Sequence, residues 1–148
     1  FAPDIWFQFY FKQINKSVSI PNVLRGLHIA PWGKLVHCYS GNVYQVVVDT
    51  REDSSTFGEV FTCQMGDQNP VAVWIPPFCA NGLCVLGEEK AVYGYSVTAT
   101  YQPGQEWGLI WNDPEIFAKI NWPVRKPILS EKDTQNQTLS ELFPNKKP

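Results

Sequence analysis

Histidine, net charge and long apolar runs are scarce in this sequence, and each scarcity excludes a class of function. The 148 residues carry 12 basic and 14 acidic side chains, which leaves a formal net charge of −2. Nucleic-acid binding requires a concentrated surface of lysine and arginine, whereas the basic runs here are only two residues long, Arg125-Lys126 and the terminal Lys146-Lys147. The apolar runs are far shorter than the roughly 20 residues that span a bilayer. We therefore expect no nucleic-acid partner and no membrane contact.

The two histidines, His28 and His37, are too few for an ordinary metal centre. Catalytic zinc sites take three protein ligands, so we expect no metal. The sequence also contains no G-x-S-x-G turn for a serine nucleophile, no G-x-G-x-x-G loop and no Walker loop. These absences predict a protein that works without a dinucleotide or any other cofactor.

The four cysteines do not form a C-x-x-C pair, which argues against a zinc knuckle or a thioredoxin motif. We interpret them as reduced, mostly buried small side chains; they are Cys38, Cys63, Cys79 and Cys84. The N-terminus lacks the charged-then-apolar order of a signal peptide. Together these features predict a cytoplasmic location.

What the sequence does contain is a series of short runs rich in β-branched and aromatic residues, separated by Gly, Pro and Asn turns. This pattern is typical of an all-β sandwich or barrel, and the length suits a single domain over residues 1–148. The strands that we expect are Lys34–Tyr39, Val43–Asp49, Val71–Ile75, Gly82–Leu86 and Ala91–Tyr101.

The Val43–Val48 run is apolar on both faces except at Gln45. Such a run predicts a strand that is covered on both sides, either between two sheets or at a subunit contact. As an open edge it would promote aggregation, which favours a dimer.

From Glu106 onward the chain is rich in Trp, Pro and charge, which predicts a tail wrapped over the barrel. Two short helices are expected in this tail. One is Asp113–Ala118, opened by Asp-Pro, and the other is Thr138–Phe143, after a cap region at Asn136-Gln137.

Arg25 and His28 combine a cation and an imidazole just before a turn. Because they are three residues apart, an ideal strand would point them to opposite faces. Gly26 lies between them and permits a bulge that would aim both side chains inward.

Segments that share order and spacing with one enzyme family run from about Gln13 to Leu142. They are Val23–His28 with Gly33–Val36, Gly41–Val43 with Val46–Arg51, Ser54–Gly58, Trp74–Phe78, Trp111–Pro114, Trp122-Pro123 and Leu129–Asp133. In these segments the chain resembles the dTDP-4-dehydrorhamnose 3,5-epimerase family. The resemblance implies a cupin-type jelly-roll β-barrel without metal, to which the sequence adds a short helical C-terminal tail, and it implies a homodimer.

The resemblance also implies a reaction, in which carbon centres beside the C4 ketone of a nucleotide-linked 4-keto-6-deoxy sugar are inverted. His28 matches the base, and a histidine exchanges protons near neutral pH. Asp133 matches the carboxylate that pairs with this base. Lys34 matches the lysine that faces the developing enolate oxygen. Tyr95 matches the acid on the opposite face, with Tyr93 as its rival.

Four further residues match substrate contacts of the family. Arg25, Gln13 and Asn15 match positions that contact the diphosphate and the sugar, where a guanidinium and amides suit phosphate oxygens. Asn81 replaces a histidine of the family's Ala-His-Gly-Phe segment and is able to bind a sugar hydroxyl, but not to act as an acid. The same replacement occurs in relatives that act on GDP-linked 4-keto heptoses, so the resemblance leaves the substrate open.

Other departures concern loops. The connection between His28 and Lys34 is about four residues shorter than in the family, and the usual Asp-x-Arg-Gly segment is absent from residues 1–12. We expect either a truncated chain or different phosphate contacts. Two alternatives to the epimerase remain open: a sugar-nucleotide 3,4-ketoisomerase and a non-catalytic barrel that binds a sugar or nucleotide.

Overall fold

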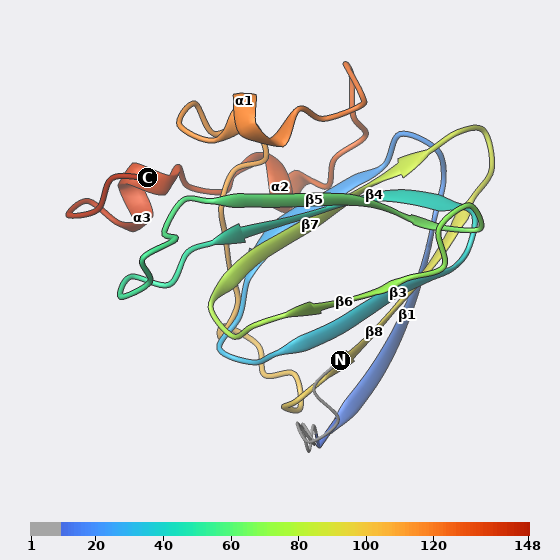
Figure 1. Cartoon of the computed structure of the whole chain (residues 1–148), viewed down its shortest axis with the longest axis horizontal. Helices are drawn as coiled ribbons and strands as arrows, with labels where there is room; N and C mark the ends of the chain where they lie inside the picture. The colour runs from blue at the N-terminus through green and yellow to red at the C-terminus, as the bar shows by residue number, and fades with distance from the viewer. Residues whose placement is uncertain (1–9) are drawn as a thin grey trace.

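The computed structural model describes residues 10–148, and in this part of the chain two antiparallel sheets lie face to face (Figure 1). In spatial order, the first sheet contains β1 (Gln13–Ser19), β8 (Ala91–Val97), β3 (Lys34–Ser40) and β6 (Ala72–Ile75). The second contains β5 (Val60–Gly66), β4 (Asn42–Asp49), β7 (Cys79–Leu86), β2 (Leu24–Ile29) and β9 (Trp107–Gly108). The all-β prediction is confirmed.

The space between the two sheets is filled by side chains from both of them. Val36 of β3, Val43 of β4 and Met65 of β5 belong to one buried cluster here. Each such side chain contributes about 1.5–3 kcal/mol when it is fully removed from water. The polar exceptions in this layer, described below, are therefore informative.

β4 is covered on both faces, as its sequence predicts. Val43 faces the other sheet, whereas Val46 and Val48 belong to a second buried cluster together with Ile120 and Leu139 of the C-terminal tail. The cover on the outer side is thus the chain's own tail rather than a neighbouring subunit. The apolar character of this strand does not by itself require a dimer, and that part of the sequence argument is wrong.

Three short helices in the tail lie on the outer side of the five-stranded sheet (Figure 1). They are α1 (Phe117–Ile120), α2 (Glu131–Thr134) and α3 (Leu139–Leu142). α3 confirms the second predicted helix, and a capping box places its N-cap at Thr138 rather than at Asn136-Gln137. None of the helices in residues 10–148 is long and apolar enough to cross a membrane.

The first predicted helix, Asp113–Ala118, is displaced. Asp113 accepts hydrogen bonds from the amides of Glu115 (2.9 Å) and Leu139 (2.7 Å). Its carboxylate therefore closes a turn and ties it to α3, so the helix begins only at Phe117. α2 has no counterpart among the predictions.

The sequence analysis does not predict β1, because polar and apolar side chains alternate there in the reverse of the usual order, with the polar ones inward. Gln13, Asn15 and Ser17 are half-buried and share one face, while Ile14 and Val18 are exposed. The inward face of this strand is polar. A strand with its polar side toward the barrel indicates that the interior near it binds something other than apolar side chains.

Candidate active site

A bulge in β2 brings the side chains of Arg25 and His28 to one cavity. Along the β2–β7 pair, Arg25 lies opposite Leu83 and His28 opposite Asn81, so β2 contains one extra residue. Gly26 takes φ +115°, and a Cβ there would lie 2.7 Å from the carbonyl oxygen of Asn81. Arg25 and His28 consequently line one cavity, as the sequence predicts.

This cavity, of about 180 Å³, gathers five of the predicted site residues: Arg25, His28, Lys34, Asn81 and Tyr95. They come from both sheets. Gln13 and Asn15 instead line an adjoining cavity of about 240 Å³, which shares Tyr95 and Glu106 with the first. Asp133 lies behind His28, outside the first cavity, so all eight predicted residues lie in one region. The predicted absence of an Asp-x-Arg-Gly segment falls largely on residues 1–9, outside the described residues.

His28 and Asp133 form a close polar pair, with 2.7 Å between Nε2 and Oδ1. The Asp133 side chain is 4% exposed and the His28 side chain 29%. Burial raises the pKa of Asp133, but the hydrogen bond and charge of His28, with further hydrogen bonds from Ser130 and the Gly26 backbone, outweigh it and hold this pKa below its usual value. A carboxylate that remains ionised is a strong hydrogen-bond partner, and it holds the imidazole in one orientation.

Lys34 begins β3 and is buried, with its Nζ 3.1 Å from Oε1 of Glu106. Burial lowers the pKa of Lys34, whereas the charge and hydrogen bond of Glu106 raise it. The charge of Lys132 adds to the lowering. The result is a fixed ammonium whose pKa lies below its usual value. Such a group stabilises an oxyanion in a site that excludes water.

The structure separates the two candidate tyrosines. The Tyr93 hydroxyl is buried and donates a 2.6 Å hydrogen bond to Oε1 of Gln45. The Tyr95 hydroxyl has no recorded hydrogen-bond partner among residues 10–148 and belongs to both cavities. Burial raises the pKa of Tyr95, and Glu106 raises it further. Tyr95 is therefore protonated near neutral pH and free to donate a proton.

Amide side chains and aromatic rings line the second cavity. Gln13 donates from Nε2 to Oδ1 of Asn15 (2.7 Å) and accepts at Oε1 from the amide of Tyr101 (3.0 Å), which fixes both amides. The rings of Trp32 and Tyr101 pack edge to face, with 6.3 Å between their centroids. These walls suit a flat ring with polar edges.

Arg25 and Asn81 complete the first cavity. The Nε of Arg25 donates to Oγ of Ser19 at 3.0 Å, which leaves the end of the guanidinium for an anion. The Oδ1 atom of Asn81 is buried without a hydrogen-bond partner within residues 10–148. An unpaired polar atom beside His28 indicates a group completed by a ligand or by solvent.

Sequence reasoning missed two polar residues that line the first cavity, Ser17 and Glu106. Ser17 had a signal, since it continues the period-two row of Gln13 and Asn15. Glu106 had none, because it stands in an irregular turn-rich segment before β9. Within residues 10–148, no three His, Cys, Asp or Glu side chains are grouped so that they could hold a metal ion.

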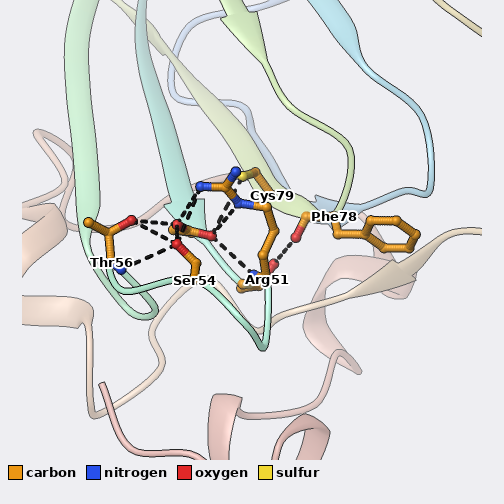
Figure 2. Close-up of polar contacts among 7 residues, drawn as sticks. Arg51, Ser54, Thr56, Phe78 and Cys79 are labelled. Atoms are coloured by element: carbon orange, nitrogen blue, oxygen red, sulfur yellow. Dashed lines mark hydrogen bonds and ion pairs between the residues drawn. The ribbon is translucent and has the colours of Figure 1, made fainter.

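A larger cavity, of about 650 Å³, lies elsewhere and is lined by none of the predicted residues. Its wall includes the loop after β4, where Arg51, Ser54 and Thr56 all bind the Asp49 carboxylate (Figure 2). The ring of Phe78 points away from this polar cluster. Because Arg51 is already neutralised by Asp49, this cavity offers no base, acid and cation together. We therefore assign the candidate active site to the smaller, connected cavities.

Comparison with known proteins agrees with this geometry. The sequence profile described as dTDP-4-dehydrorhamnose 3,5-epimerase matches residues 2–141. The enzyme of that name from Shigella flexneri is 43% identical over 131 residues, which covers 86% of this chain and 71% of the relative.

Two solved structures have the same fold. A 4-keto-6-deoxy sugar epimerase from the novobiocin gene cluster of Streptomyces spheroides superposes with a TM-score of 0.87 at 33% identity, covering 92% of this chain and 69% of that one. A dTDP-6-deoxy-D-glucose-3,5-epimerase from Legionella pneumophila, solved with dTDP-4-keto-L-rhamnose, gives a TM-score of 0.85 at 35% identity, covering 93% and 73%. The predicted cupin-type barrel is confirmed, and the chain belongs to the dTDP-4-dehydrorhamnose 3,5-epimerase family of isomerases.

Proposed function

We propose that this protein is an epimerase that inverts C3, C5 or both in a dTDP-linked 4-keto-6-deoxy sugar. The observation that carries the proposal is that His28, with Asp133 hydrogen-bonded behind it, lines one cavity together with Lys34 and Tyr95. A base, an electrostatic partner for an oxyanion and a separate acid are the three groups that inversion next to a ketone requires.

The reaction follows from these positions. His28 takes the proton from the carbon beside the ketone, and the electron pair of that C–H bond moves into the carbonyl to give an enolate. The Lys34 ammonium stabilises the enolate oxygen, and Tyr95 then returns a proton to the same carbon from the other face. Exchange with solvent resets His28 and Tyr95. Proton transfer by a positioned side chain is worth about 10²–10⁴ in rate, and a fixed charge at the oxyanion about 10²–10³.

The adjoining cavity supports a nucleotide substrate. Its Tyr101 and Trp32 rings offer a stacking surface for a base, while Gln13 and Asn15 offer amides to the ribose or phosphates. Arg25 provides a cation for the diphosphate. Asn81 replaces an ionisable residue beside His28, so its role is to bind a sugar hydroxyl rather than to exchange protons.

Proton NMR in heavy water tests this function. The protein is mixed with dTDP-, GDP- and CDP-linked 4-keto sugars, and deuterium incorporation at C3 and C5 is followed, with His28→Ala as the control. We expect exchange and inversion with the dTDP sugar, both lost in the variant. A product in which the carbonyl has moved to another carbon would indicate a 3,4-ketoisomerase. Binding without exchange would indicate a non-catalytic barrel. Either result would reject the epimerase.

We also propose that the protein is a cytoplasmic homodimer that associates through the outer face of the β1-β8-β3-β6 sheet. This face exposes Ile14 (73%), Val18 (54%) and Tyr39 (59%), an apolar surface that favours contact with a second copy. The four cysteines are free, as is usual in a reducing compartment. Sedimentation should show a dimer that Val18→Asp or Tyr39→Asp dissociates, while the equally exposed Phe61→Asp should not; a wild-type monomer would contradict the proposal.

A further inference from the structure

Glu106 occupies the junction of the two cavities and lines both. Its carboxylate lies 3.1 Å from Nζ of Lys34, and the two side chains are only 18% and 8% exposed. The pair joins the start of β3 to the segment before β9, and both of its residues line the first cavity. An ion pair this enclosed is screened little by solvent, so its removal has a measurable effect.

We propose that Glu106 is a positioning residue that keeps both Lys34 and Tyr95 protonated and holds the Lys34 ammonium over the cavity. This inference rests on the proposed function for its catalytic meaning. Its electrostatic part is independent of any substrate.

The charges around Lys34 show why one carboxylate matters. Burial and the cation of Lys132 both disfavour the ammonium, and Arg25 and His28 line the same cavity. Glu106 is the anion that offsets them, through its charge and its hydrogen bond. Without it, Lys34 would lose its proton at a lower pH and would no longer stabilise an enolate.

The same carboxylate acts on Tyr95. Burial raises the pKa of Tyr95, Glu106 and Tyr101 raise it further, and Arg25 lowers it. One negative charge therefore favours the proton-bearing form of two groups at once: the cation of Lys34 and the neutral phenol of Tyr95. The proposed reaction requires these two forms, since enolate stabilisation needs the ammonium and inversion needs the phenol proton.

NMR titration of the free protein, labelled with ¹³C at lysine Cε and tyrosine Cζ, tests the electrostatic part. Signals of the two residues are assigned by their loss in Lys34→Arg and Tyr95→Phe. In Glu106→Gln we expect the pKa of both residues to fall, that of Lys34 by about one pH unit or more. Glu106→Asp, which keeps the charge one methylene further away, should restore part of the shift. Glu59→Gln, which removes the surface partner of Lys119 at 3.6 Å, is the matched control and should move neither. A folded Glu106→Gln protein with both values unchanged overturns the inference.

The catalytic part is tested by the pH profile of deuterium exchange. In Glu106→Gln the alkaline limb should move to lower pH, so that the loss of rate at pH 9 exceeds the loss at pH 7 by about tenfold. An equal loss of exchange rate at all pH values would assign Glu106 a merely structural role. Loss of the acid limb of the profile would indicate that Glu106 is itself a base in the reaction. Both results reject the proposal. If the wild type exchanges no sugar, the proposed function fails while the titration result still stands.

Discussion

His28 and Asp133 are 105 positions apart in the chain, yet their Nε2 and Oδ1 atoms are 2.7 Å apart. The tail makes this contact because Ile128 runs beside the start of β2, accepting a hydrogen bond from the amide of Leu24 (2.9 Å) and donating one to the carbonyl of Asn22 (2.8 Å). Ser130 then caps α2 and sets Asp133 in its first turn. His28, the proposed base, is thus oriented by a segment outside the barrel.

Asp133→Asn should reduce deuterium exchange by about 10²–10⁴ while the fold is kept. The amide preserves shape, but it no longer stabilises a protonated imidazole or fixes the same tautomer. Exchange rates by NMR measure this, with Glu131→Gln, an exposed neighbour in the same helix, as the control. An acid–base partner should be worth far more than a loss of about threefold in rate. A variant whose exchange rate stays within that range of wild type would show that Asp133 is not needed to orient the base.

Tyr95→Phe should separate exchange from inversion. His28 still removes the proton, exchanges it with solvent and returns deuterium to the same face, so exchange persists with retained configuration while the inverted product falls by about 10² or more. The measurement is the ratio of exchange to inversion in heavy water.

Tyr93→Phe is the matched control for this prediction. It leaves Oε1 of Gln45 buried and unpaired, which costs about 1–3 kcal/mol of folding free energy, but it should not alter the ratio. If Tyr93→Phe changes the ratio and Tyr95→Phe does not, the assignment of the two tyrosines is reversed.

These two tyrosines also show what sequence is able to predict. Tyr93 and Tyr95 are two residues apart on one strand, so both face the barrel and periodicity does not distinguish them. The difference comes from Gln45 of β4, a partner remote in sequence that occupies one hydroxyl. By contrast, the bulge at Gly26 was predictable, because a local residue type decides it.

The missed features have two different physical reasons. β1 turns its polar side chains inward and exposes Ile14 and Val18, so the rule that apolar residues face the core misreads it. A polar wall suits a polar ligand, which explains the reversal at this strand. Glu106 is placed by the path of an irregular segment that ends at β9, for which no period exists. The eight predicted site residues were found through family motifs, which carry these positions directly.

Asp49→Asn should destabilise the protein by about 2 kcal/mol or more near neutral pH, since it breaks the ion pair and hydrogen bonds that this buried carboxylate makes with Arg51, Ser54 and Thr56 (Figure 2). Hydrogen bonds from Arg51, with smaller ones from Ser54 and Thr56, hold the pKa of Asp49 far below its usual value of 3.8. A depressed folded-state pKa contributes stability that is complete above the unfolded value and declines as the pH falls below it.

The difference in unfolding free energy between wild type and Asp49→Asn should therefore be constant from pH 5 to 8 and shrink below about pH 4. Urea unfolding at several pH values measures it. Glu52→Gln, in the same loop but exposed, is the control and should show little change. A difference that grows toward acid pH would contradict the role given to this carboxylate.

Gly26→Ala should remove activity and destabilise the fold by more than a change at an unobstructed glycine. At Gly26 a Cβ would lie 2.7 Å from both the Asn81 carbonyl oxygen and the Gly82 Cα, in a backbone of φ +115°. Gly87 also has a positive φ, +71°, but nothing lies within 4 Å of its Cβ position. Gly87→Ala therefore reports the backbone cost alone, on the order of 1–2 kcal/mol.

The excess measured for Gly26→Ala over Gly87→Ala combines the forced separation of β2 and β7 with the larger backbone cost of a side chain at φ +115°, and we expect it to be about 1–3 kcal/mol or more. Because Arg25 and His28 lie on either side of this glycine, the same separation should displace the proposed diphosphate contact and the proposed base together. Exchange should then fall at every substrate concentration, with a raised KM as well as a lowered kcat. Equal stability losses for the two variants, with normal exchange in Gly26→Ala, would show that the bulge tolerates a side chain and that the aim of His28 does not depend on it.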